Sequence, residues 1–148
     1  MGLIRLEDDQ LVRVQEIDAQ HQGMVDLINQ LHKAMMRGSD RAALSDIIGD
    51  LIAHTRTHFR YEEQLMLQGG YPGYVKHKQQ HDVLLRHITD LDERYRNGDL
   101  LLSFAVMIDL KGWALSHIAK YDVALGAYLN RAPRIQRLGD SPSRSASP

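Results

Sequence analysis

Four long stretches of this chain repeat apolar residues at steps of three and four, and short segments containing glycine, proline or asparagine separate them. In the first stretch the repeating residues are Met24, Val25, Leu27, Ile28, Leu31, Ala34 and Met35. This spacing gives a helix one apolar face, which has to be buried against other helices. Four long helices with short links favour an antiparallel up-down-up-down four-helix bundle, so the predicted fold class is all-α.

Capping residues and helix breakers set the expected ends of these helices. The expected ranges are Asp18 to Gly38, Ser39 or Asp40 to Gly69, a third helix that follows the turn Tyr71-Pro72-Gly73 and ends near Asn97, and Asp99 to about Asn130. Residues 1 to about 17 lack a sustained helical period, and we expect them to form an extended N-terminal arm packed along the bundle.

The two ends of the chain differ in composition from its middle. Residues 133–148 are rich in Ser, Pro and Arg, cannot bury much surface, and are predicted to form a disordered tail. Residues 1–132 then form a single domain. The first residues are interrupted by charges and no apolar run is long enough for a membrane span, so the sequence predicts a cytoplasmic protein without membrane insertion.

The composition excludes several kinds of site. The chain has no cysteine, which rules out disulfides, thiolate metal sites and cysteine nucleophiles. Its 18 basic and 19 acidic residues give a net charge of −1 without long blocks of either sign, so we expect no binding to nucleic acid. A metal site in this chain has to use histidine and carboxylate ligands.

Eight histidines are many for a chain of this length. One pair of residues four apart lies on the second expected helix and another on the third, and four-residue spacing puts both members of a pair on one helix face. The first expected helix adds one candidate ligand and the fourth adds two. The candidate metal ligands are therefore His21, His58, Glu62, His77, His81, His117 and Asp122. A lone pair of this kind is more often an ordinary surface pair. Convergence from all four helices favours a metal site in the bundle core.

Counting coordination positions points to two metal ions with one position to spare. Two octahedral ions together have about twelve coordination positions, of which five imidazoles fill five and two bridging carboxylates fill four. Of the three positions left, a bridging oxide or hydroxide fills two. Imidazole and carboxylate suit iron, manganese or zinc, and iron adds redox exchange with dioxygen. The sequence therefore predicts two non-haem iron ions with an oxo or hydroxo bridge and one open position.

Four segments carry a resemblance to a known family: IDAQH, HFRYEE, HKQQH and WALSHIAKYD. From about residue 10 to 130 the chain resembles the bacteriohemerythrins. The resemblance implies that Glu62 and Asp122 bridge the irons, that three histidines (His77, His81 and His117) complete one iron, and that the other iron, held by His21 and His58, binds dioxygen.

The implied function is an oxygen carrier, store or delivery protein and not an enzyme. Two alternatives stay open: an oxygen or redox sensor that acts through the arm or the tail, and a di-iron peroxidase or oxidase at the same site. Any protein that accepts the oxygen is undefined. Against an oxidising enzyme, such bundles use more carboxylates and a Glu-x-x-His spacing, which is absent here.

Three further expectations concern single positions. His117 and Asp122 are five residues apart, about 140° around a regular helix, which predicts either a widened π-type turn between them or a long reach across the core. His32 and His87 are interpreted as polar-face residues, and His54 as a structural histidine, with a hydrogen bond that supports a metal ligand as the alternative. Ala114 stands where the resemblance leads us to expect leucine, which predicts a more open pocket.

Overall fold

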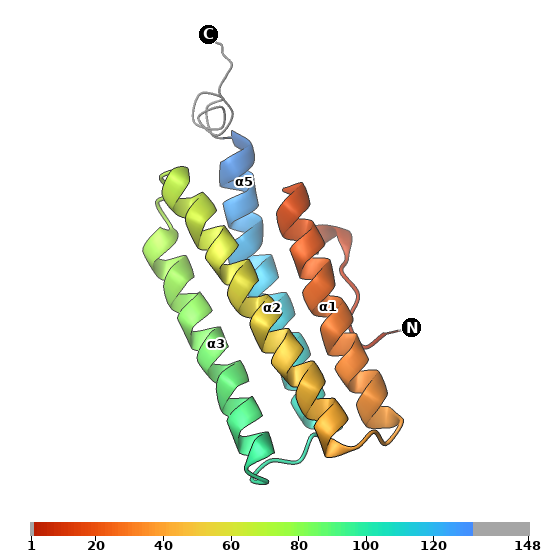
Figure 1. Cartoon of the computed structure of the whole chain (residues 1–148). Helices are drawn as coiled ribbons and strands as arrows, with labels where there is room; N and C mark the ends of the chain where they lie inside the picture. Colours follow the sequence, from red (N-terminus) through yellow and green to blue (C-terminus); the bar gives the residue numbers. More distant parts are fainter. Residues whose placement is uncertain (1, 132–148) are drawn as a thin grey trace.

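The computed structural model describes residues 2–131, and within this range the chain is almost entirely helical (Figure 1). A short 3-10 turn, η1 (Asp8–Gln10), precedes the first long helix. The helices are α1 (Gln15–Met36), α2 (Arg41–Gln68), α3 (Tyr74–Arg96), α4 (Phe104–His117) and α5 (Val123–Arg131). A π-helical turn, Ile118–Asp122, joins α4 to α5 without a break, so these three elements form the fourth rod of the bundle.

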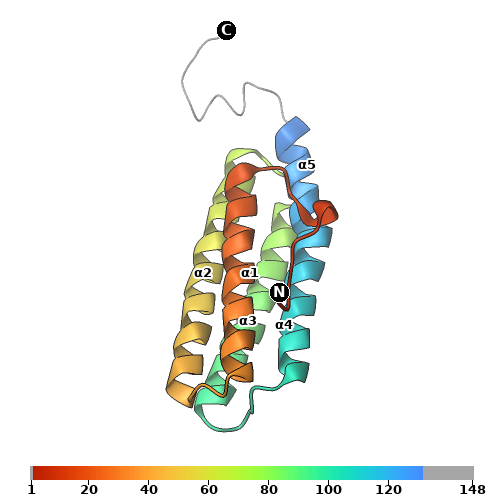
Figure 2. The same cartoon turned by 90° about the vertical axis from the view of Figure 1, so that its right-hand side faces the viewer.

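Consecutive rods run in opposite directions and lie beside one another, as Figures 1 and 2 show from two sides. The links between them are short, residues 37–40, 69–73 and 97–103. The predicted all-α, up-down-up-down bundle is therefore confirmed. None of the helices in the described range is long and apolar enough to cross a membrane. The predicted tail, residues 133–148, lies outside the described residues.

Most of the expected helix ends agree with the structure. The Asp40 side chain accepts a hydrogen bond from the Ala43 N–H at 2.8 Å and caps α2. Gly38 follows α1 with φ +75°, and Gly98 follows α3 with φ +81°. This left-handed conformation suits glycine because a Cβ atom would be strained there.

Two expected helix starts were wrong. The first helix begins at Gln15 rather than after Asp18, whose carboxylate instead accepts hydrogen bonds from the backbone N–H groups of Val12 (2.7 Å) and Arg13 (3.0 Å). Asp18 thus fastens the arm instead of capping its own helix. The fourth rod begins at Phe104 rather than Asp99, because Ser103 is the residue that accepts from the Val106 N–H.

The N-terminal arm lies across α1 and the fourth rod, as expected, but it is shorter than predicted because α1 takes residues 15–17 (Figure 2). Ile4 and Val12 are its buried residues. The Asn29 side chain both accepts from the Ile4 N–H and donates to the Ile4 carbonyl. Farther along, the arm passes so close to α5 that a Cβ at Gly126 would overlap the Val12 carbonyl oxygen. The absence of a side chain at Gly126 therefore allows the arm to pack against α5.

The bundle core has two apolar layers separated by a polar one. The larger apolar layer contains Ile28, Leu51 and Leu110 among others, and the smaller one comprises Val12, Ile17, Met66 and Leu125. Between them along each helix stand the predicted metal ligands. Burying polar groups in a core is costly unless they have partners, so this middle layer is the place to look for function.

Candidate metal centre

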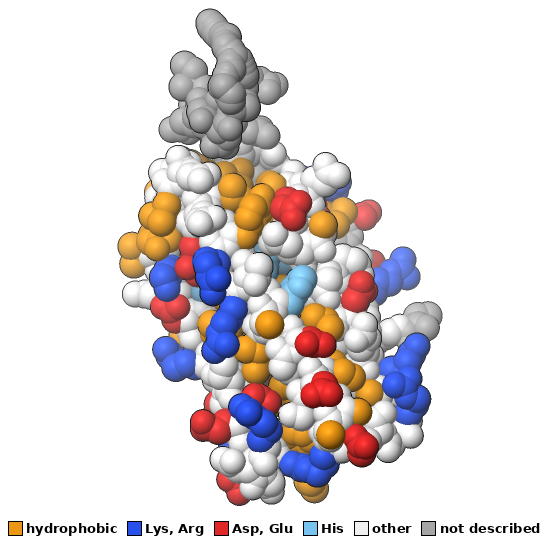
Figure 3. All heavy atoms as spheres, in the orientation of Figure 1, with side chains coloured by type: hydrophobic (Ala, Val, Ile, Leu, Met, Phe, Trp, Pro, Cys, Tyr) orange, Lys and Arg blue, Asp and Glu red, His pale blue; other side chains and the backbone are white. Residues whose placement is uncertain are grey.

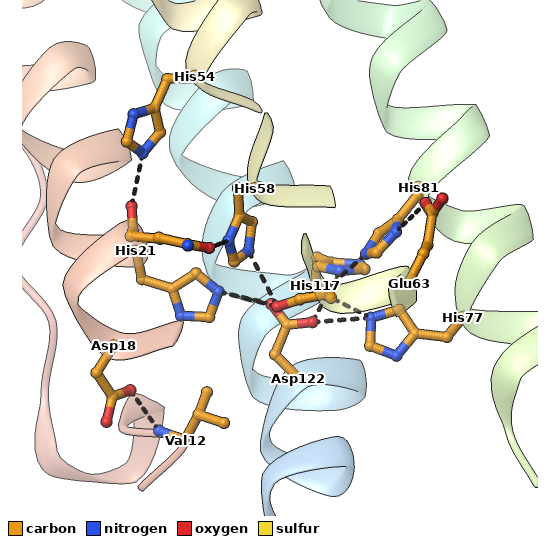
Figure 4. A network of polar contacts seen from close by, with 12 residues as sticks. Val12, Asp18, His21, His54, His58, Glu63, His77, His81, His117 and Asp122 are labelled. Carbon is orange, nitrogen blue, oxygen red and sulfur yellow. Dashed lines mark hydrogen bonds and ion pairs between the residues drawn. The ribbon is translucent and has the colours of Figure 1, made fainter. Parts of the chain in front are cut away.

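All seven predicted ligand residues meet in the polar layer. Each of their side chains is 6% or less exposed, and all except His117 are at 1% or below. Figure 4 shows the imidazoles reaching toward Asp122 from the surrounding helices. α1 supplies His21, α2 supplies His58 and Glu62, α3 supplies both of its histidines, and the fourth rod supplies His117 and Asp122.

The seven residues form two overlapping groups that could each hold a metal ion. One group contains Glu62, His77, His81, His117 and Asp122, and the other contains His21, His58, Glu62 and Asp122. Within each group, the ligand atoms lie within 4.8 Å of one another. Both carboxylates belong to both groups, as bridging ligands would, and the histidines divide three to two.

Most contacts between these side chains are short but poorly aligned for hydrogen bonding; the exception is a hydrogen bond of 3.0 Å between the His81 Nε2 atom and a Glu62 oxygen. The His21 Nε2 and His77 Nε2 atoms each lie 2.9 Å from an Asp122 oxygen, and the His58 Nε2 atom lies 3.0 Å from a Glu62 oxygen. Yet no hydrogen-bond partner among residues 2–131 serves these three nitrogens. The same holds for four more inward atoms: His117 Nε2, Glu62 Oε2 and both Asp122 oxygens. Seven orphaned atoms around shared centres are the arrangement expected of metal ligands.

A widened helical turn brings Asp122 to this centre. The Val123 N–H donates to the Ile118 carbonyl, five residues earlier, and residues 118–122 form the π-helical turn. The His117 Nε2 atom then lies 3.1 Å from an Asp122 oxygen. The five-residue spacing predicted either this bulge or a long reach across the core, and the structure shows the bulge.

Two of the histidines are held from outside by side chains that the sequence analysis did not identify. The His58 Nδ1 atom donates to the Gln20 amide oxygen at 2.6 Å, and the His81 Nδ1 atom donates to the Glu63 carboxylate at 2.8 Å. Such bonds fix the ring orientation and turn each Nε2 atom inward, where that of His81 lies 3.0 Å from a Glu62 oxygen. The only feature of the sequence that could have pointed to these two residues is their position, since Gln20 directly precedes the candidate ligand His21 and Glu63 directly follows the candidate ligand Glu62.

His54 lies outside both groups. Figure 4 shows His54 away from the imidazoles that surround Asp122. Its Nε2 atom is 2.9 Å from the backbone carbonyl of Gln20, so it contacts the residue that holds His58. His32 is half-buried near Phe104, and His87 is exposed beside Trp113.

The buried carboxylates set the charge of the centre. Burial alone lowers the pKa of the His21 and His77 imidazoles, but contacts with Asp122 and Glu62 outweigh burial and raise each pKa to about 9. Burial opposes ionisation of Glu62 and Asp122 as well, yet the surrounding histidines hold the pKa of both carboxyls below its usual range. The two anions thus attract positive charge, which protons supply when no metal does.

Comparison with known proteins agrees with this geometry. The family model described as the hemerythrin HHE cation binding domain matches residues 12–128. The chain belongs to the hemerythrin family. It is 31% identical over 143 residues to a bacteriohemerythrin of Stenotrophomonas maltophilia, covering 94% of this chain and 92% of that protein. It is 34% identical over 120 residues to a bacteriohemerythrin of Pseudomonas aeruginosa, and this match covers 78% of this chain and 74% of that protein.

Solved hemerythrin structures have the same fold. The crystal structure of wild-type hemerythrin superposes with a TM-score of 0.80 at 27% identity, and the match covers 85% of this chain and 97% of that one. The description of the family model as a cation binding domain agrees with the two groups of candidate metal ligands.

Beside the candidate centre, this hemerythrin-family chain has a cavity of about 30 Å³. The lining combines candidate ligands such as His21 and His58 with apolar side chains, including Met24, Trp113 and Ala114. A cavity of this size is enough for one or two water-sized molecules. It contacts both histidines of the smaller ligand group and His117 of the larger one.

Proposed function

We propose that this chain binds dioxygen reversibly at a non-haem di-iron centre and serves as an oxygen carrier, store or delivery protein. The observation that carries the proposal is the pair of overlapping ligand groups that share both carboxylates and divide five histidines three to two. In this proposal Glu62 and Asp122 would serve both ions. His77, His81 and His117 would hold one ion, and His21 and His58 would hold the other, which has fewer protein ligands and would take the dioxygen.

The residues present fit a pair of iron ions. Seven inward-pointing atoms without hydrogen-bond partners, in the described part of the chain, are an adequate donor set for two ions. Neutral imidazoles and carboxylates suit iron in its accessible oxidation states, and iron when bound supplies the reversible electron exchange that dioxygen binding requires. Two carboxylate charges offset part of the charge of the metal pair in this buried layer.

The rest of the site supports binding rather than turnover. Gln20 and Glu63 hold two of the rings in place, and the Phe59 ring stacks on His81 with centroids 3.8 Å apart. The cavity beside His21 and His58 is small and mostly apolar, so it admits a small neutral molecule more readily than an ion. No described side chain beside the free position is placed as an obvious acid or base for the proposed ligand, which favours a carrier over an oxidase or peroxidase.

Anaerobic reduction followed by oxygen titration tests the proposal. We expect two irons per chain, visible charge-transfer bands that grow with added oxygen, and loss of those bands under vacuum. One metal per chain would contradict the paired centre. Bands that persist under vacuum, or oxygen consumption that continues without saturation, would contradict reversible binding and favour an enzyme.

A further inference from the structure

A groove of about 200 Å³ lies between α2 and α3, one side chain away from the candidate centre. Its rim carries Arg56 and Arg60, one turn apart on α2, and Lys78 on α3. Lys78 forms an ion pair with Asp82 at 2.9 Å. For Arg56 and Arg60, by contrast, residues 2–131 provide neither an ion pair nor a hydrogen bond. The groove therefore presents two uncompensated guanidinium groups.

The charge of this groove contrasts with that of its surroundings. The chain as a whole has a net charge of −1. Figure 3 shows several Lys and Arg side chains, interspersed with Asp and Glu, over the α2–α3 half of this face, while a row of Asp and Glu side chains follows the α1–α2 half. A local positive field beside a negative one orients an approaching charged protein as well as attracting it.

The floor of the groove leads directly to a candidate metal ligand. Glu63 lines the groove with its side chain 20% exposed, and its carboxylate accepts from the Nδ1 atom of His81, which is 1% exposed. The Phe59 ring stacks flat on His81, with 5° between the planes. Figure 4 shows Glu63 on the side of His81 that faces away from Asp122. His81 itself lines the groove together with Glu63 and Phe59, so a candidate metal ligand lies directly at its floor.

We propose that the α2–α3 groove is the docking site of an acidic one-electron carrier protein, of the iron–sulfur or flavin class, that reduces the iron. Electron transfer weakens steeply with distance, so a carrier gains most by docking where a metal ligand comes nearest the surface. The arginines attract an acidic partner to that point, and a small, salt-sensitive contact suits a brief redox encounter.

This proposal rests on the proposed di-iron function, which needs ferrous iron to bind dioxygen. Each docking event moves one electron: the carrier is oxidised by one electron, and one ferric ion becomes ferrous. Two events return a diferric centre to the diferrous state. A proton from solvent converts an oxide bridge to hydroxide, so charge and atoms balance.

Binding of an acidic plant-type ferredoxin to the iron-loaded protein tests the surface without any turnover. Both proteins are kept oxidised, and Kd is measured by calorimetry at low ionic strength and again at higher salt. We expect Arg56→Gln and Arg60→Gln to weaken binding roughly two- to fivefold each, because exposed charge pairs contribute about 0.2–1 kcal/mol. The double variant should bind roughly tenfold more weakly, and salt should weaken the wild-type complex.

Lys33→Gln is the matched control, since Lys33 is an exposed cation on α1, away from the groove. It should leave Kd unchanged. In stopped-flow experiments, reduction of the iron by reduced ferredoxin should slow in the arginine variants in parallel with Kd. Reduction by the methyl viologen radical cation should not slow.

Three results would overturn the docking site: no ferredoxin binding at low salt, equal Kd in wild type and double variant, or an equal loss of binding in Lys33→Gln. The arginines contact no candidate ligand, so the variants should keep two irons and normal oxygen binding. A wild-type protein that lacks paired iron or reversible oxygen binding would instead contradict the proposed function, so the two failures are distinguishable.

Discussion

Ala114 lines the cavity beside His21 and His58, and enlarging its side chain tests whether that cavity controls access to the centre. Ala114→Leu adds three carbons at a position that faces the space of about 30 Å³. Since the cavity also touches His117 from the same helix, the new side chain enters the path of any ligand that approaches the free metal position. The expected result is slower ligand exchange.

The size of the effect follows from the cavity. At about 24 cal/mol per Å³, filling this space is worth roughly 0.7 kcal/mol, or about threefold in a rate that requires it to be emptied. Complete burial of three carbons, at about 0.8 kcal/mol each, sets an upper limit of roughly 2.4 kcal/mol, or about 50-fold. The rate constant for azide binding to the ferric protein should therefore fall by about threefold to 50-fold in Ala114→Leu.

Two assays measure the change. Stopped-flow azide binding gives the access rate, and the lifetime of the oxygenated protein in air should lengthen, because water and anions that promote its oxidation reach the centre less easily. Ala105→Leu makes the same replacement at an exposed position of α4 and should alter neither rate. Unchanged azide binding and oxygenated lifetime in Ala114→Leu would refute a gating role for this position.

Three other predictions follow from the site and the arm. Glu62→Ala should reduce the metal content from two ions per chain to one or none, because both ligand groups lose a shared carboxylate; retention of two ions by elemental analysis would argue against bridging. Gly126→Ala should lower the free energy of unfolding by about 1–3 kcal/mol in urea denaturation, because the new Cβ overlaps backbone of the arm, whereas Gly49→Ala, with open space around its Cβ, should not destabilise. In the metal-free protein, the raised pKa of about 9 for His21 and His77 gives stability that is full below pH 6.5 and lost as pH rises to 9; a level urea midpoint across that window would contradict it.

The parts of the molecule that were predictable from sequence depend on spacing along one helix. Apolar steps of three and four defined four rods, and the four-residue steps of His58 to Glu62 and of His77 to His81 put each pair on one face. The five-residue step from His117 to Asp122 does not fit one face of a regular helix, and it pointed to the widened turn as one of two ways to bring these residues together. These inferences needed only the geometry of a helix.

The features that were missed depend on contacts between elements. Aspartate is a common helix-capping residue, but the Asp18 carboxylate accepts hydrogen bonds from backbone N–H groups of the arm. The arm lies beside Asp18 only in the folded chain. Gln20 and Glu63 each orient a histidine on a neighbouring helix rather than on their own. The rotation of one helix against the next decides such pairings, and a single sequence does not specify that rotation.

The π-helical turn also sets the orientation of two residues that follow it, Asp122 and Gly126. One additional residue in residues 118–122 turns everything that follows by about 100° around the rod. That rotation aims Asp122 at the centre and also turns the bare surface of Gly126 toward the Val12 carbonyl. A deletion of one residue in this turn would therefore misdirect the carboxylate and unseat the arm together, and no single substitution elsewhere could restore both. Insertions and deletions should be rare between His117 and Gly126 in related chains that keep both features, even where side chains change freely.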